Sequence, residues 1–68
     1  MKISARNVLK GKVVDIAKGA TTAHVRIDIG GAIVTASITN ESVDDLGLVK
    51  GMTASAVIKS SDVMVAVE

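Results

Sequence analysis

Two short segments near the ends of the chain are rich in hydrogen-bond donors and poor in acids. Residues 4–7 read Ser-Ala-Arg-Asn, and residues 59–61 read Lys-Ser-Ser. Side chains two residues apart lie on the same side of an extended chain, so Ser4 and Arg6 can converge. The second segment offers an ammonium, two hydroxyls and backbone N–H groups that can form an anion-binding nest. Such donors suit a small tetrahedral dianion, which needs cations for its charge and donors to replace its lost water.

Each segment also has an ordinary explanation, because Ser-x-Arg arises by chance and Lys-Ser-Ser is common in turns. Catalytic alternatives find less support. The only histidine, His24, has no partner in the sequence that would orient it as a base, and we expect it to be exposed or at an interface. Asp44 and Asp45 are adjacent and diverge on a helix, where capping and solvation explain them. No phosphate loop is present. We therefore do not expect an enzyme.

The length and composition predict one small domain, residues 1–68, that associates with itself. So short a chain buries only about 60% of its surface, which leaves the fold marginal without disulfides, a metal or association. The sequence has no cysteine and one histidine, which excludes disulfides and the usual zinc sites. Hydrophobic residues make up 49% of the chain, and we predict a homo-oligomer.

Composition also disfavours two classes of partner. The chain has no Phe, Trp or Tyr on which bases could stack, and its net charge of +1 gives no broad field for nucleic acids or membranes. No stretch approaches the roughly 18 apolar residues of a membrane span, and residues 1–7 lack the apolar run of a signal peptide. The expected location is the cytoplasm, without nucleic acid or membrane as partner.

Apolar and polar residues alternate along most of the chain, which predicts strands. The alternation slips at Val13-Val14, close to Gly11, which predicts a bulge where the strand turns a corner. Gly30-Gly31 separates two alternating runs and predicts a hairpin. The predicted strands cover residues 8–18, 23–29, 32–39, 53–59 and 63–67.

One short helix is expected between the third and fourth strands. Residues 40–47 combine capping-type side chains, acids, two apolar residues three apart and a final glycine. Ser42 with Asp45 fits a capping box. About five strands with a helix after the third is the arrangement of OB-type barrels. The predicted fold class is all-β, an OB-like small β-barrel.

The two donor-rich segments, taken together, resemble the molbindins, small cytoplasmic molybdate-binding proteins whose single Mop domain is related to TOBE domains. The similarity covers essentially the whole chain. Its most specific parts are Ile-Ser-Ala-Arg-Asn at residues 3–7 and Val-Ile-Lys-Ser-Ser-Asp-Val-Met at residues 57–64. It extends through Leu-Lys-Gly at residues 9–11 and through residues 38–51, which include Leu-Gly-Leu and Lys-Gly.

The resemblance implies a homo-hexamer, a trimer of dimers, that stores or buffers molybdate or tungstate without an organic cofactor or a protein-bound metal ion. The oxyanion would lie between subunits. In that family the principal site uses the serine and arginine of the opening motif, the threonine after the third strand, and the lysine and serine of the closing motif. These donors are all present here: Ser4, Arg6, Thr39, Lys59 and Ser60.

Further candidates follow from the same resemblance. Ser42, at the start of the short helix, is a neighbour of the principal site. A second class of site in the family lies near the threefold axis, and here the turn between the first two strands is its candidate, chiefly through backbone N–H groups. The residues concerned are Lys18, Gly19, Thr21, Thr22 and Ala23.

One alternative stays open: a TOBE-type regulatory or interaction module that binds a protein partner or a different oxyanion, such as sulfate or phosphate. Sulfate has the charge of molybdate, so only cavity size and donor placement separate the two. Phosphate near neutrality keeps a proton, and a site that offers only donors would reject its hydroxyl for lack of an acceptor.

Overall fold

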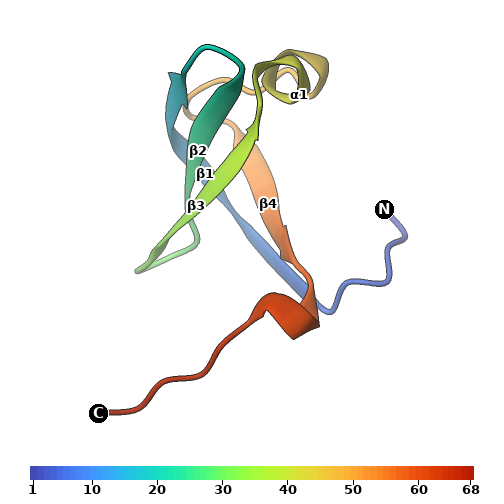
Figure 1. Ribbon diagram of the computed structural model, residues 1–68, viewed down its shortest axis with the longest axis vertical. Helices are drawn as coiled ribbons and strands as arrows, with labels where there is room; N and C mark the ends of the chain where they lie inside the picture. The colour runs from blue at the N-terminus through green and yellow to red at the C-terminus, as the bar shows by residue number, and fades with distance from the viewer.

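The computed structural model describes all residues from Met1 to Glu68 and contains one antiparallel sheet in the strand order β3-β2-β1-β4. The strands curl into a half-barrel with one short helix at its upper end (Figure 1). This confirms the predicted all-β, OB-like fold class. The elements are β1 (Asn7–Lys18), β2 (Thr22–Asp28), β3 (Ile33–Thr39), α1 (Asn40–Asp45), β4 (Thr53–Ile58) and the 3-10 turn η1 (Ser60–Asp62).

The long strand β1 holds the sheet together because it pairs with two neighbours. Its first half pairs with β4, beginning at Asn7 opposite Ile58, and its second half pairs with β2, ending at Lys18 opposite Ala23. The register with β2 shifts between Val13 and Asp15, which confirms the predicted bulge. A bulge bends and twists a strand. Here it lets β1 pair with β4 along its first half and with β2 along its second half.

Gly11 lies where β1 begins to pass the end of β2. A Cβ at this position would stand 2.3 Å from the carbonyl oxygen of Asp28 and 2.8 Å from Cγ2 of Ile27. Since the nearest atom is backbone, it cannot move aside as a flexible side chain would. The close crossing of the two strands therefore requires glycine for lack of space.

We expect Gly11→Ala to lower the free energy of unfolding by about 2–3 kcal/mol, because overpacking forces the two backbones apart. Urea denaturation at one fixed protein concentration measures this loss. Ala17→Ser, a small change on an exposed position of the same strand, serves as the control and should leave the transition in place. Equal midpoints for the two variants would contradict the proposed crowding at Gly11.

The core consists of small and branched aliphatic side chains, as a chain without aromatics requires. Strand β2 shows the predicted alternation, with Val25 and Ile27 buried and His24 and Arg26 exposed. All the buried residues are hydrophobic: Val13, Ala23, Val25, Ile27, Val43 and Ala56. This is a thin core, and much apolar surface stays open to solvent.

The predicted hairpin and helix are both present, but the helix is capped differently from the prediction. The turn between β2 and β3 contains Gly30 and Gly31 at φ of 92° and 96°, which glycine adopts readily. The N-cap of α1 is Thr39, whose hydroxyl accepts the N–H of Ser42 at 3.0 Å. The predicted capping box of Ser42 with Asp45 is therefore wrong, because the helix begins three residues earlier than that box requires.

The prediction of a fifth strand at residues 63–67 is wrong for this chain, which has four strands. After η1 the tail runs away from the half-barrel (Figure 1). Val63 is half exposed, and Met64, Val65 and Val67 are nearly fully exposed, at 92%, 90% and 92%. Alternation predicts an extended conformation but not a neighbour, and a strand exists only where another strand satisfies its backbone. The edges of β3 and β4 remain unpaired within the chain.

No helix in the structure has the length and apolar character needed to cross a membrane.

Candidate functional site

The opening and closing motifs meet at one end of the half-barrel in an open depression. Its floor and walls come from the segment before β1, from the end of β4 and from η1, which lie together at the lower end of the sheet (Figure 1). The lining residues are Ile3, Ser4, Ala5, Val57, Lys59, Ser60 and Ser61. They supply one ammonium and three hydroxyls, and no carboxylate is among them. The structure thus brings together Ser4, Lys59 and Ser60, three of the residues for which anion binding is predicted.

Strand pairing brings the two motifs together although they are more than fifty residues apart. Asn7 opens β1 directly opposite Ile58, the last residue of β4. The Asn7 side-chain amide donates to the carbonyl of Ile58 at 3.3 Å and to the hydroxyl of Ser60 at 3.4 Å. Within η1, the N–H of Asp62 donates to the carbonyl of Lys59 at 2.9 Å, which turns the chain immediately after the lysine. The sheet thus determines where Lys59 and Ser60 lie.

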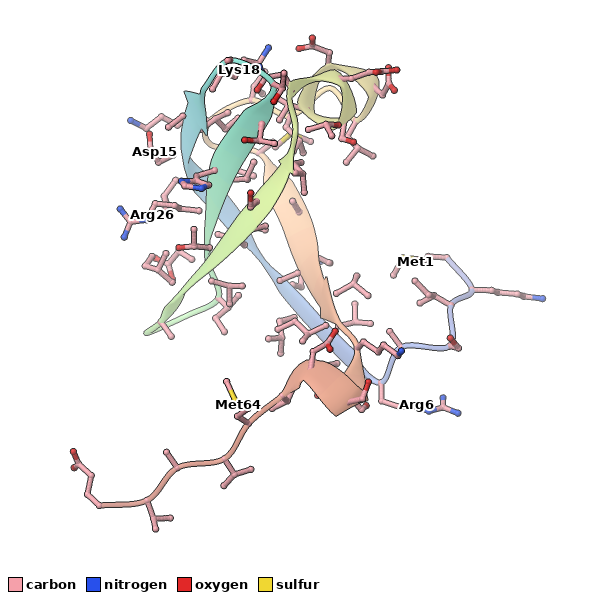
Figure 2. All side chains as sticks on the ribbon, viewed as in Figure 1. Met1, Arg6, Asp15, Lys18, Arg26 and Met64 are labelled. Carbon is pink, nitrogen blue, oxygen red and sulfur yellow. The ribbon has the colours of Figure 1, made fainter.

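Arg6 is adjacent to the depression but does not line it. Figure 2 shows its guanidinium extending away from the sheet into solvent. Within one chain, therefore, the cation that faces the depression is Lys59.

Thr39, the N-cap of α1, and Ser42, in its first turn, lie at the opposite end of the fold. The Thr39 hydroxyl donates to the Ser42 hydroxyl at 2.8 Å and accepts the N–H of Ser42. Thr39 pairs with Thr22, beyond the far end of β1 from Asn7. The 12 residues of β1 separate the two ends, in a molecule whose longest extent is 35 Å. The structure therefore does not bring Thr39 and Ser42 together with Ser4, Lys59 and Ser60 within one chain.

We expect Thr39→Val to lower the free energy of unfolding by about 1 kcal/mol, because the helix loses its N-cap acceptor. Thr39→Ser keeps the hydroxyl and should restore most of the loss. Thr35→Val, at an exposed position two residues earlier in β3, is the matched control and should have little effect. Thermal unfolding of the three variants at equal concentration measures the difference, and a Thr39→Val protein as stable as the parent would contradict the capping role.

The turn of residues 18–23 is held by contacts of its own. The ammonium of Lys18 forms an ion pair with Asp44 at 2.7 Å (Figure 2 labels Lys18 beside the helix). The side-chain amide of Asn40 donates to the carbonyl of Gly19 at 2.9 Å, while its own oxygen is buried without a partner. The charge of Lys18 is thus already compensated. An anion site in this turn, through Lys18, Gly19, Thr21, Thr22 and Ala23, stays a prediction.

Two features of the site were not foreseen from the sequence. Asn7 belongs to the opening motif, but only the strand pairing reveals that its side chain contacts Ser60. The surroundings of Thr39 are acidic, since α1 carries Glu41, Asp44 and Asp45. In the sequence, the position of Asn7 directly after Arg6 could have indicated that it lies near the site. The spacing of the acids from Thr39 could have indicated that they lie near its hydroxyl.

No group of three or more His, Cys, Asp or Glu side chains could hold a metal ion.

The fold and the depression define a small OB-like domain with a cluster of cationic and hydroxyl side chains at one end. The TOBE domain family matches residues 3–65, and the chain belongs to this family. A relative from Clostridium pasteurianum, called molybdenum-pterin-binding protein 3, is 54% identical over 66 residues, which cover 96% of this chain and 97% of the relative.

Solved structures agree with this assignment. A molybdate-binding protein from Sporomusa ovata matches with a TM-score of 0.92 and 41% identity, covering 97% of this chain and 98% of that one. The cytoplasmic molybdate-binding protein ModG, solved with molybdate bound, matches with a TM-score of 0.89 and 45% identity. That match covers 94% of this chain and 46% of ModG. The names of these proteins describe binding and not catalysis.

Proposed function

We propose that this protein binds molybdate, or tungstate of the same shape and charge, reversibly between subunits of a homo-oligomer. The observation that carries the proposal is the depression in which Ser4, Lys59 and Ser60 meet without any carboxylate. An ammonium supplies charge, and the hydroxyls replace the hydration that the dianion gives up. Relatives of the same length named for molybdenum binding, and a related structure with molybdate bound, support this choice of oxyanion.

The separation of the donors is the reason to propose a shared site. Thr39 and Ser42 lie close to Glu41, Asp44 and Asp45, of which only Asp44 is paired with a cation, Lys18, so an anion there needs further cations to compensate the remaining acids. The other end of the chain carries Lys2, Arg6 and Lys59. Opposite charges at the two ends favour contact between the helix end of one copy and the motif end of another. Such a contact would bring Thr39 and Ser42 of one copy to Ser4, Arg6, Lys59 and Ser60 of the next.

The exposed surface supports association of the chain. The isolated chain exposes 5226 Å², whereas a compact protein of 6.9 kDa is expected to expose roughly 4,000 Å². The excess of about 1,200 Å² is comparable with the roughly 800 Å² that one partner contributes to a typical interface. Large hydrophobic side chains such as Leu46, Val49 and Val67 contribute to this exposed surface, and association would remove them from water.

The tail is the segment that we expect to cover part of this surface. A groove lies between the open strands β3 and β4, and 13 of its 15 lining residues are hydrophobic. The tail offers Val63, Val65 and Val67 on one face of an extended segment and leads away from its own groove (Figure 1). Residues 63–67 of a second copy would close the barrel as its fifth strand, which explains why the sequence pattern predicts a strand there. A trimer of such dimers would give the expected hexamer.

Reversible binding of the oxyanion, with no reaction catalysed, fits a role in its storage or homeostasis. The expected location is the cytoplasm, where ModG is described as located. The names of some relatives also mention pterin. A pterin is a flat heterocycle that stacks on aromatic side chains, and this chain has none. The donor-lined depression favours the bare oxyanion, with no organic cofactor.

Calorimetric titration of the anion-free protein with molybdate, tungstate, sulfate and phosphate tests this function. We expect micromolar or tighter binding of the first two and weak or no binding of phosphate. A folded oligomer that binds none of the four anions would contradict the proposal and would favour a TOBE-type module for a protein partner. Binding of sulfate or phosphate in preference to molybdate would assign the site to a different oxyanion.

A further inference from the structure

The closing motif contributes a second hydroxyl to the depression, that of Ser61. Three hydroxyls line the depression, those of Ser4, Ser60 and Ser61, beside the ammonium of Lys59. The resemblance assigns Lys59 and Ser60 to the oxyanion site but gives Ser61 no role. The turn η1 is closed by its backbone, since the N–H of Asp62 donates to the carbonyl of Lys59 at 2.9 Å. The depression therefore has one more donor than the resemblance uses.

The hydroxyls of Ser60 and Ser61 differ in what they do for the fold. The Ser60 hydroxyl accepts a hydrogen bond from the side-chain amide of Asn7 at 3.4 Å and so helps to join the two motifs. The Ser61 hydroxyl takes part in none of the side-chain hydrogen bonds of the chain. The side chain of Ser61 is exposed. Its hydroxyl is thus free to rotate toward a ligand without a loss to the turn.

The charges around Ser61 favour an anion. The ion pair of the chain joins Lys18 to Asp44 at the far end of the fold, so the ammonium of Lys59 is not paired with a carboxylate. The acid nearest in sequence, Asp62, does not line the depression. The oxygens of a tetrahedral dianion accept more hydrogen bonds than one ammonium and two hydroxyls can donate. A further donor beside Lys59 would replace more of the hydration that the dianion gives up.

We propose that Ser61 is a further binding residue of the oxyanion site and that its hydroxyl donates to an oxygen of the bound dianion, beside Lys59 and Ser60. The inference rests on the proposed function and extends its set of donors. A hydroxyl adds a hydrogen bond without adding charge. The contribution of Ser61 is therefore the same at low and high salt, whereas that of Lys59 falls as the ionic strength rises.

Ser61→Ala tests the proposal, because it removes only the hydroxyl. In calorimetric titration at one fixed protein concentration, we expect the dissociation constant for molybdate to rise about 10-fold, as for one hydrogen bond to a charged group. Ser61→Thr keeps a hydroxyl and should stay within about threefold of the parent. Ser37→Ala removes a hydroxyl from an exposed position of β3 outside the depression and should leave the affinity unchanged.

The salt dependence of binding separates direct contact from an indirect effect through Lys59. Lys59→Gln removes the charge, so its affinity should vary less between low and high sodium chloride than that of the parent. Ser61→Ala keeps the charge and should lose the same factor at both salt concentrations. If Ser61→Ala flattened the salt dependence as Lys59→Gln does, Ser61 would only position the lysine and the proposal would be overturned.

Unchanged molybdate affinity in Ser61→Ala would also overturn the proposal, and so would an equal loss in Ser61→Thr or in Ser37→Ala. Native mass spectrometry verifies that each variant keeps the assembly of the parent. Urea unfolding without molybdate should give Ser61→Ala the midpoint of the parent, and a lower midpoint would assign the hydroxyl to the fold instead. A parent protein that binds no oxyanion would overturn the proposed function itself. A parent that binds molybdate no more tightly than Ser61→Ala would overturn this inference alone.

Discussion

We expect Arg6→Ala to weaken molybdate binding by roughly 10- to 150-fold while the protein stays folded. A hydrogen bond to a charged group contributes about 1.5–3 kcal/mol, and each 1.4 kcal/mol is tenfold in affinity. Arg6 is exposed and makes no contact that stabilises the fold, so its guanidinium is available to a ligand shared with another copy (Figure 2). Calorimetric titration with molybdate measures the loss.

Arg26→Ala is the matched control for Arg6→Ala. It removes the same charge from an exposed position on β2, where Figure 2 shows the side chain pointing away from the sheet. We expect its affinity to stay within about twofold of the parent. Arg6→Lys should recover only part of the loss, because an ammonium cannot bind two oxygens as a planar guanidinium does. If Arg6→Ala bound molybdate as tightly as the parent, Arg6 would not belong to the site.

We expect Val65→Asp to dissociate the proposed assembly, with a dissociation constant at least about 100-fold higher than that of the parent. The tail would place this residue in the apolar groove of a second copy, where an unpaired carboxylate costs several kcal/mol. Sedimentation or light scattering over a concentration series measures the change. If the site is shared as proposed, the same variant should also lose molybdate binding at low protein concentration.

Met64→Asp tests the direction of the tail. The neighbouring side chains of an extended segment point to opposite faces, so Met64 faces away from the groove when Val65 faces into it. The charge is the same and the exposure in the isolated chain is nearly equal, at 92% and 90%. We expect Met64→Asp to keep the assembly. Equal dissociation by both variants, or by neither, would contradict an exchanged strand in this register.

Much of the fold could be predicted from the sequence because local patterns determine it. The alternation around Val25 predicts which face of β2 is buried, and the slip at Val13-Val14 predicts the bulge. The cap of the helix was predicted less well, because Thr39, Asn40 and Ser42 are all residue types that can serve as N-cap. The choice of Thr39 depends on where β3 ends.

The alternating pattern of residues 63–67 could not show whether they pair with another strand of the same chain. Residues 63–67 alternate like any strand, but the partner that would satisfy their backbone is not decided by local sequence. Likewise, the meeting of Ser4 with Lys59 depends on the pairing of Asn7 with Ile58, which is a long-range contact. The motifs predicted the donors, and the resemblance predicted their roles. Only the structure reveals that Thr39 lies at the opposite end of the fold.

Oxyanion binding and assembly should support each other in this protein. Lys59 and Ser60 belong to the turn from which the tail departs, so a ligand that holds them also holds the start of the exchanged segment. A ligand that binds only the assembled form stabilises it by mass action. Molybdate should therefore raise the midpoint of thermal unfolding more than sulfate at equal concentration.

Native mass spectrometry of the protein with and without molybdate tests the shared site most directly, because one spectrum reports both the number of chains and the number of bound oxyanions. We predict a hexamer that carries bound molybdate, together with loss of both the hexamer and the bound oxyanion in Val65→Asp. A monomer that retains molybdate would contradict the account, since the donors of one chain would then suffice.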